Sequence, residues 1–93
     1  MSKTFKDLIF KPHRTTKKGI QATLNLNENI DLSVVAGEGF YSSTKKEAKG
    51  IKHPDSNNFI SFEVGIITNN ESIDVIGWQS REDINNIIKK YSG

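Results

Sequence analysis

The residue types that most often carry chemistry in proteins are sparse in this chain of 93 residues. Its two histidines, His13 and His53, each lie beside a proline. His53 together with Asp55 would supply two metal ligands, and His13 would serve as a general base. A metal site usually takes three or four ligands, and neither histidine belongs to a group with that spacing. We therefore interpret both histidines as residues of surface loops.

Two short motifs match known functional signatures. "GEG" at residues 37–39 follows an apolar run, but a phosphate-binding loop leads into a helix, and Glu38 would place a negative charge in it. The glycines are better explained by a turn at the end of a strand. "SSTK" at residues 42–45 matches the S-x-x-K signature of serine acyl-transfer enzymes, whose partner motifs are missing from this chain. We expect no enzyme and no cofactor.

Other classes are excluded by composition. The chain has no cysteine, which rules out disulfides, zinc–thiolate sites and thiol catalysis and fits a reducing cytosol. The opening "MSKTFKDLIF" has a lysine and an aspartate within its apolar patch, so it does not match a signal peptide. No run approaches the roughly 20 apolar residues that span a bilayer. We expect a cytoplasmic protein that does not enter a membrane.

The basic residues are concentrated in two segments, although the net charge is only +2. Residues 1–18 carry six Lys/Arg and one acidic residue, and residues 45–53 carry four lysines and Glu47. Lysines with nearby aromatic residues can pair with phosphates and stack on bases. The candidate contacts with a protein partner or nucleic acid are Lys11, Arg14, Lys17, Lys18, Phe40, Tyr41, Lys45, Lys46, Lys49 and Lys52.

Alternating apolar residues predict the strands that would position these side chains. "IQATLNLN" (20–27) alternates strictly, and "IDLSVVAG" (30–37) follows a short polar turn, as in an antiparallel hairpin. "NFISFEVGIIT" (58–68) and "IDVIGWQ" (73–79) predict two more strands. In the third strand, we expect Ile60 on the same face as Phe62. We assign Trp78 to the core or its edge, with an interface anchor as the alternative.

The C-terminal segment "SREDINNIIKKY" (80–91) changes to the helical period. Ser80 is the expected N-cap, and apolar residues recur at helical spacing at Ile84, Ile87, Ile88 and Tyr91. The initial "FKDLIF" (5–10) fits a short strand or a helical turn. We predict one α+β domain over residues 1–93, an antiparallel sheet of four or five strands with one C-terminal helix packed on one face.

The segment from about 38 to 57 joins two predicted strands and contains no regular apolar spacing. A connection longer than about 12–15 residues tends to be functional or disordered. We predict that this basic loop is exposed and mobile, with Phe40 and Tyr41 close to the sheet. Deletion of Lys45 to Lys52 is then expected to leave the melting temperature almost unchanged.

Several motifs resemble a group of small, uncharacterised bacteriophage proteins. The similarity lies in "FKDLIFKPH", Gly19, "SVVAGEGFY", "FEV" and "IDVIGW", and it leaves out residues 42–57. The resemblance implies a phage gene product made in the bacterial host cytoplasm. It brings no assigned catalytic or binding residues, and it favours an interaction module that binds host machinery.

Two functional hypotheses follow. The first is a non-enzymatic phage accessory protein that binds a host protein, such as a defence or nucleic-acid-processing factor. The alternative is a nucleic-acid-binding protein that uses the basic segments 11–18 and 45–52, which requires both segments to lie on one side of the folded domain.

Overall fold

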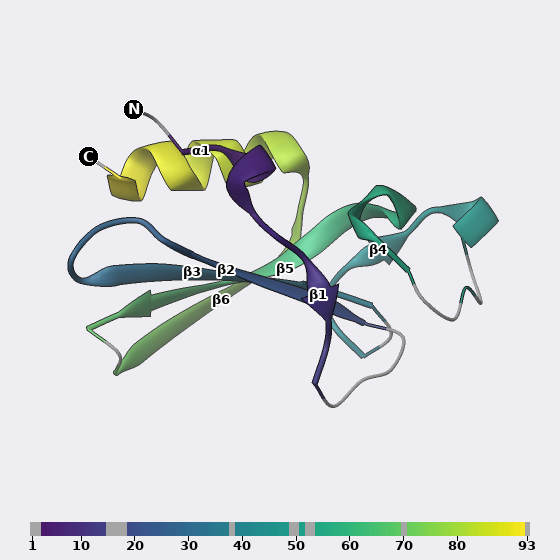
Figure 1. Cartoon of the computed structure of the whole chain (residues 1–93), viewed down its shortest axis with the longest axis horizontal. Coiled ribbons are helices and arrows are strands. Elements are labelled where there is room, and N and C mark those ends of the chain that lie inside the picture. Colours follow the sequence, from purple (N-terminus) through teal and green to yellow (C-terminus); the bar gives the residue numbers. More distant parts are fainter. Residues whose placement is uncertain are drawn as a thin grey trace.

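The computed structural model describes residues 3–14, 19–37, 39–48, 51, 54–69 and 71–92. In these residues the chain forms an antiparallel sheet with one α-helix across one face (Figure 1), as the sequence predicts. The sheet has six strands because two strands of only two residues join the predicted ones. The elements are η1 (Phe5–Asp7), β1 (Lys11–Pro12), β2 (Ile20–Asn25), β3 (Ile30–Ala36), β4 (Ser43–Thr44), η2 (Lys46–Ala48), η3 (Ser56–Asn58), β5 (Phe59–Thr68), β6 (Ser72–Gln79) and α1 (Arg81–Ser92), where η denotes a single 3-10 turn.

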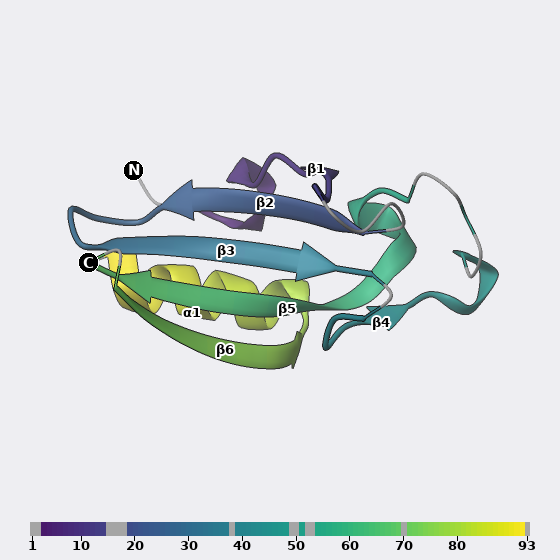
Figure 2. The same cartoon turned by 90° about the horizontal axis from the view of Figure 1, so that it is seen from below.

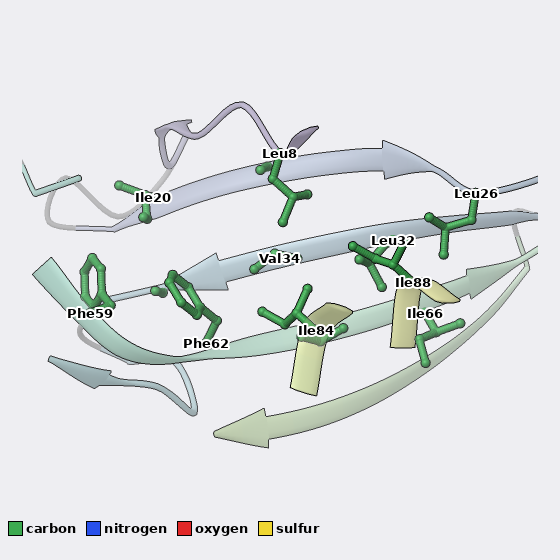
Figure 3. Packing of buried hydrophobic residues seen from close by; sticks show 13 residues of the cluster. Leu8, Ile20, Leu26, Leu32, Val34, Phe59, Phe62, Ile66, Ile84 and Ile88 are labelled. Atoms are coloured by element: carbon green, nitrogen blue, oxygen red, sulfur yellow. The ribbon is translucent and has the colours of Figure 1, made fainter. Parts of the chain in front are cut away.

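The β2–β3 hairpin follows the predicted alternation. Ala22 pairs with Val34, and both are buried, as are Ile20, Leu32 and Ala36, whereas Leu24 is partly buried. The side chain of Asn27 closes the connection by accepting hydrogen bonds from the backbone amides of Asn29 and Ile30. The apolar face of this hairpin forms one half of the core beneath α1 (Figure 3).

Strand β5 follows the predicted alternation only from Phe62 onward. Phe62 is fully buried, but Ile60 is 55% exposed while Phe59 and Ser61 are buried, so the prediction for Ile60 is wrong. The physical reason is that β5 has two partners along one side. Its first residues pair with β4, its later residues pair with β6, and the register shifts within both pairings. These irregularities reverse the inward face at the start of the strand.

Helix α1 begins at the predicted cap. The Ser80 hydroxyl accepts a hydrogen bond from the Asp83 amide, and the Asp83 carboxylate accepts one from the Ser80 amide. The apolar stripe is confirmed, since Ile84 and Ile88 have no exposed surface and Ile87 is partly buried against the core (Figure 3). The helix buries this stripe against the sheet.

Polar contacts fix α1 along its length. The Arg81 guanidinium donates to the carbonyls of Ser56 and Phe59 at the start of β5. Asn85 accepts a hydrogen bond of 2.7 Å from the Phe5 amide, which holds η1 against the helix. At the other end, the Asn27 side chain donates to the Tyr91 carbonyl over 2.7 Å. These hydrogen bonds hold α1 against the sheet and η1 along its whole length.

The two edges of the sheet differ. The strand order is β1-β2-β3-β5-β4, and β6 pairs with β5 beside β4 (Figure 2). One edge is therefore β1, which consists of Lys11 and Pro12 only. The other edge is largely β6, with eight residues. In the described part of the chain, no helix covers the sheet face turned away from α1, which we call the outer face (Figures 1 and 2).

The segment 38–57 contains more structure than predicted. Besides β4, it includes the turns η2 and η3, and Ala48 is only 4% exposed. The Lys45 amide donates to the Asn58 carbonyl over 2.8 Å. Apart from Ala48, its described residues are exposed or half-buried, so the segment is not a buried site, as predicted. The prediction of a connection without regular elements is wrong. The polar sequence has no strand or helix period because each of its elements is too short to show one.

Candidate functional site

Apolar side chains are exposed on the outer face along β6. Val75 pairs with Gly65 and Ile73 pairs with Ile67, and directly paired residues of an antiparallel sheet share a face. Because the neighbouring Val64 and Ile66 face the core, Ile73 and Val75 must point to the outer face. Ile73 is 63% exposed and Val75 is 56% exposed. A strand with this much apolar surface in water suggests a contact site.

An aromatic pair continues this surface at the end of β6. The rings of Tyr41 and Trp78 have centroids 5.1 Å apart, and each residue is more than half exposed. The Trp78 amide donates to the Tyr41 carbonyl over 2.8 Å. A Cβ atom on Gly77 would lie 2.6 Å from the Cβ of Tyr41, so only glycine permits this approach. Tyr41 therefore lies against the outer face of β6.

The backbone at Trp78 has an unusual conformation. Its φ angle is +52°, in the left-handed region that large side chains disfavour by about 1–2 kcal/mol. The register shift in the β5–β6 pairing falls beside it. The prediction that Trp78 belongs to the core or its edge is wrong, because this irregularity turns the indole outward at the rim of the sheet.

The ionisable residues of β5, β6 and the turn between them are all acidic. Residues 54–80 contain no lysine, arginine or histidine. Asp74 lies on β6, Glu71 lies in the turn before it, and both side chains are exposed. Glu63, on the outer face of β5, accepts a hydrogen bond of 3.3 Å from the Tyr41 amide. We define the β6 surface as the side chains of Tyr41, Ile73, Val75 and Trp78 together with the backbone edge of β6 before Trp78, which pairs with no other strand among the described residues.

The predicted basic contacts lie elsewhere. Lys11 is on β1, and Arg14 follows it, whereas Lys45 and Lys46 follow β4, on the other side of β2, β3 and β5 in the sheet. Lys11, Arg14 and Lys46 are exposed, and Lys45 is half-buried. The remaining predicted contacts, Lys17, Lys18, Lys49 and Lys52, lie outside the described residues, as does His53.

Phe40 links the two segments that carry these basic residues. Its ring centroid lies 4.9 Å from that of His13, and its ring packs close to Gly19. Phe40 and Tyr41 thus lie near the sheet, as predicted, but they contact different elements. Tyr41 belongs to the β6 surface, whereas Phe40 packs beside the β1–β2 connection.

Other kinds of site find little support in the described residues. No three His, Asp or Glu side chains in that part of the chain are grouped so that they could hold a metal ion. A shallow hollow of about 310 Å³ between Ile9 and β2 contains Lys11 as its one charged side chain. None of the helices in the described ranges is long and apolar enough to cross a membrane.

The comparisons with known proteins identify no relative. No protein family, curated protein or solved structure matches the chain. The β6 surface is therefore defined by its geometry and chemistry alone.

Sequence reasoning assigned Tyr41 to a contact surface and gave Trp78 an interface role only as the alternative, and it missed Ile73 and Val75. A signal for them was present. The run "SIDVIGWQ" has apolar residues at both alternating sets of positions, so a strand there has an apolar side chain on each face. Only one helix was predicted to cover the sheet, which leaves one of these faces in water.

Proposed function

We propose that this protein is a non-enzymatic protein-binding module whose contact site is the β6 surface. One observation carries the proposal. Ile73 and Val75 lie on the sheet face that no described helix covers (Figure 2), Tyr41 and Trp78 adjoin them at the end of β6, and the four side chains are between 56% and 63% exposed. Aromatic residues, tryptophan and tyrosine above all, dominate the binding energy of protein interfaces. A left-handed backbone at Trp78 supports a binding role, because such strain is concentrated at functional sites.

The expected partner is a bacterial host protein, met in the host cytoplasm. This part of the proposal rests on the resemblance of "FKDLIFKPH" and "IDVIGW" to small phage proteins. The surface itself favours protein over nucleic acid, because its side chains are apolar or aromatic and the ionisable residues of β5, β6 and the turn between them are acidic. Phosphates would be repelled by such a surface.

The test is a quantitative pull-down from bacterial lysate with two variants of the immobilised protein. Tyr41→Ala combined with Trp78→Ala removes both rings of the surface. Ile9→Ala is the matched control, because Ile9 is 75% exposed but lies beside β2, away from β6. We expect the wild type and the Ile9→Ala control to retain the same host protein, and we expect the double variant not to retain it. Retention by all three proteins, or by none, would contradict the proposal.

Nucleic-acid binding is the second candidate. It is favoured by the contact between Phe40 and His13, which joins the basic segment 11–14 to the chain that precedes Lys45. Neutralised phosphates release counterions, so the affinity must fall steeply with salt. A gel shift that shows salt-sensitive binding, weakened by Lys11→Gln with Arg14→Gln, would support this candidate. Binding that does not depend on salt would exclude it.

A further inference from the structure

The backbone edge of β6 is open in the described structure. Among the described residues, β6 pairs with β5 on one side only, and a further contact from its backbone is the Trp78 amide bond to Tyr41. Natural proteins usually protect an edge strand by making it short or by placing lysine or proline in it. The opposite edge, β1, has both forms of protection, since it consists of Lys11 and Pro12. Strand β6 has eight residues and neither residue type.

A strand added to this edge would also cover the apolar surface. Side chains of a strand alternate between the two faces of a sheet. Every second side chain of an added strand would therefore lie on the outer face beside Ile73 and Val75, and the strand would end near the rings of Tyr41 and Trp78. Main-chain hydrogen bonds and apolar contacts are combined in this way when proteins bind peptides by strand addition.

The charge around β6 selects the kind of segment. Asp74 pairs with Ile66 and therefore lies on the α1 side of β6, Glu71 lies in the turn before it, and both are exposed. The sequence of β5, β6 and the turn between them contains no basic residue. A segment with lysine or arginine would pair with these carboxylates, since opposite charges on neighbouring strands are favourable. A second copy of the chain would instead bring another Asp74 and Glu71 to the same edge, where like charges repel.

We propose that β6 accepts an extended segment of the partner protein as an additional strand, and that this segment alternates apolar residues with lysine or arginine. The inference rests on the proposed protein-binding function and specifies how the partner is recognised. It requires both the free edge and the acidic surroundings, so each requirement can be removed separately.

The experiment uses a synthetic peptide of alternating valine and lysine, about seven residues long, which matches a typical strand. The peptide is added to the full chain labelled with ¹⁵N. We expect amide shifts concentrated in β6 and a dissociation constant below about 1 mM that rises with salt, because exposed charges are screened. Two further peptides test the requirements. One has glutamate in place of lysine, and the other carries N-methyl groups on alternate backbone nitrogens, which block its hydrogen bonds to β6. We expect both to bind at least about tenfold more weakly.

A variant of the chain tests the site itself. Val75→Lys places a positive charge on the exposed outer face of β6. We expect this variant to bind the valine–lysine peptide about tenfold or more weakly than the wild type does. Ile73→Lys is the second variant, in case the first one disturbs folding. Thr23→Lys is the matched control, because Thr23 is an exposed outer-face residue of β2, away from β6, and this variant should bind as the wild type does.

Three results would overturn the inference. The first is that no β6 amide shifts at about 1 mM peptide, and the second is that the N-methylated or the glutamate peptide binds as tightly as the valine–lysine peptide. The third is a dimer in sedimentation whose β6 amides are protected from exchange without any peptide. The proposed function fails separately. A host protein that depends on Tyr41 and Trp78, found together with a peptide that does not touch β6, would retain the function and reject strand addition. Strand addition without a captured host protein would retain the site and reject the host partner.

Discussion

At the scale of single residues, Trp78 combines an exposed indole with a left-handed backbone, and neither property favours folding. The contact with the tilted Tyr41 ring offsets about 0.5–1.5 kcal/mol of this cost. A residue kept under these conditions is more consistent with a binding role than with a structural one.

Replacement of Trp78 tests this interpretation. Glycine accepts a positive φ angle, whereas β-branched valine resists it strongly. Both changes remove the indole, so we expect both Trp78→Gly and Trp78→Val to abolish partner capture. Trp78→Gly should nevertheless be more stable than Trp78→Val by about 1 kcal/mol or more in urea unfolding. Equal stabilities would show that the left-handed conformation is absent in solution.

Arg81 has the opposite character, because it is a charged residue with a structural role. Besides its bonds to two carbonyls, its guanidinium lies 5.3 Å from the ring centroid of Phe5 and 5.2 Å from that of Phe62. Arg81→Met keeps an apolar chain of similar length but loses the hydrogen bonds and the cation–π contacts. We expect the free energy of unfolding to fall by about 2–3 kcal/mol, measured by urea titration.

Lys89→Met is the control for Arg81, since it makes a similar change at an exposed position of the same helix. It should alter the free energy of unfolding by no more than about 0.5 kcal/mol. If Arg81→Met lowers the free energy of unfolding by no more than Lys89→Met does, the contacts of the guanidinium with β5 and the two rings do not stabilise the fold.

At the scale of elements, the pairing of β6 with the chain around Tyr41 depends on one glycine. A Cβ on Gly77 would lie within 2.6 Å of the Cβ of Tyr41, which belongs to a stiff part of the side chain. We expect Gly77→Ala to push Tyr41 away, lower stability by about 1–3 kcal/mol and change the fluorescence of the single tryptophan, Trp78. Gly65→Ala is the control, because its nearest neighbour would be 3.7 Å away. It should leave the fluorescence unchanged, and a similar change in both variants would contradict this account.

Elements with an unbroken period could be predicted from the sequence, and elements that depend on distant neighbours could not. The strands β2 and β3 and the helix α1 have regular apolar spacing, and their core residues and cap were correctly predicted. The face of Ile60 and the position of Trp78 depend instead on register shifts that arise only when β4, β5 and β6 meet. The contact of Tyr41 with Trp78 could not be predicted for the same reason, whereas the exposure of Ile73 and Val75 could have been predicted from the apolar residues at both alternating sets of positions in β6.

At the scale of the whole molecule, the segment 38–57 contributes to the fold. Thr44 pairs with Phe59, the Lys45 amide is bonded to Asn58, and Ala48 is buried. Contrary to the expectation from sequence, deletion of Lys45 to Lys52 with a short replacement turn should destabilise the domain. We expect a loss of about 1–2 kcal/mol and a melting temperature lower by roughly 5–15 °C in a thermal unfolding curve. Lys46→Gln, which changes only an exposed charge, should melt as the wild type does.

The unequal edges of the sheet also have a consequence for stoichiometry. When both edges of a sheet are open, each copy of the protein can pair with a copy at either edge, and the copies can assemble into a fibre. Among the described residues, β1 pairs with only Ile20 and Gln21 of β2, and its Lys11 and Pro12 disfavour a further strand at that margin. A strand bound at β6 is therefore not expected to be continued at the opposite margin. Complexes formed at β6 should therefore be saturable, with one partner segment for each chain, and solutions of the complex should remain clear at high concentration.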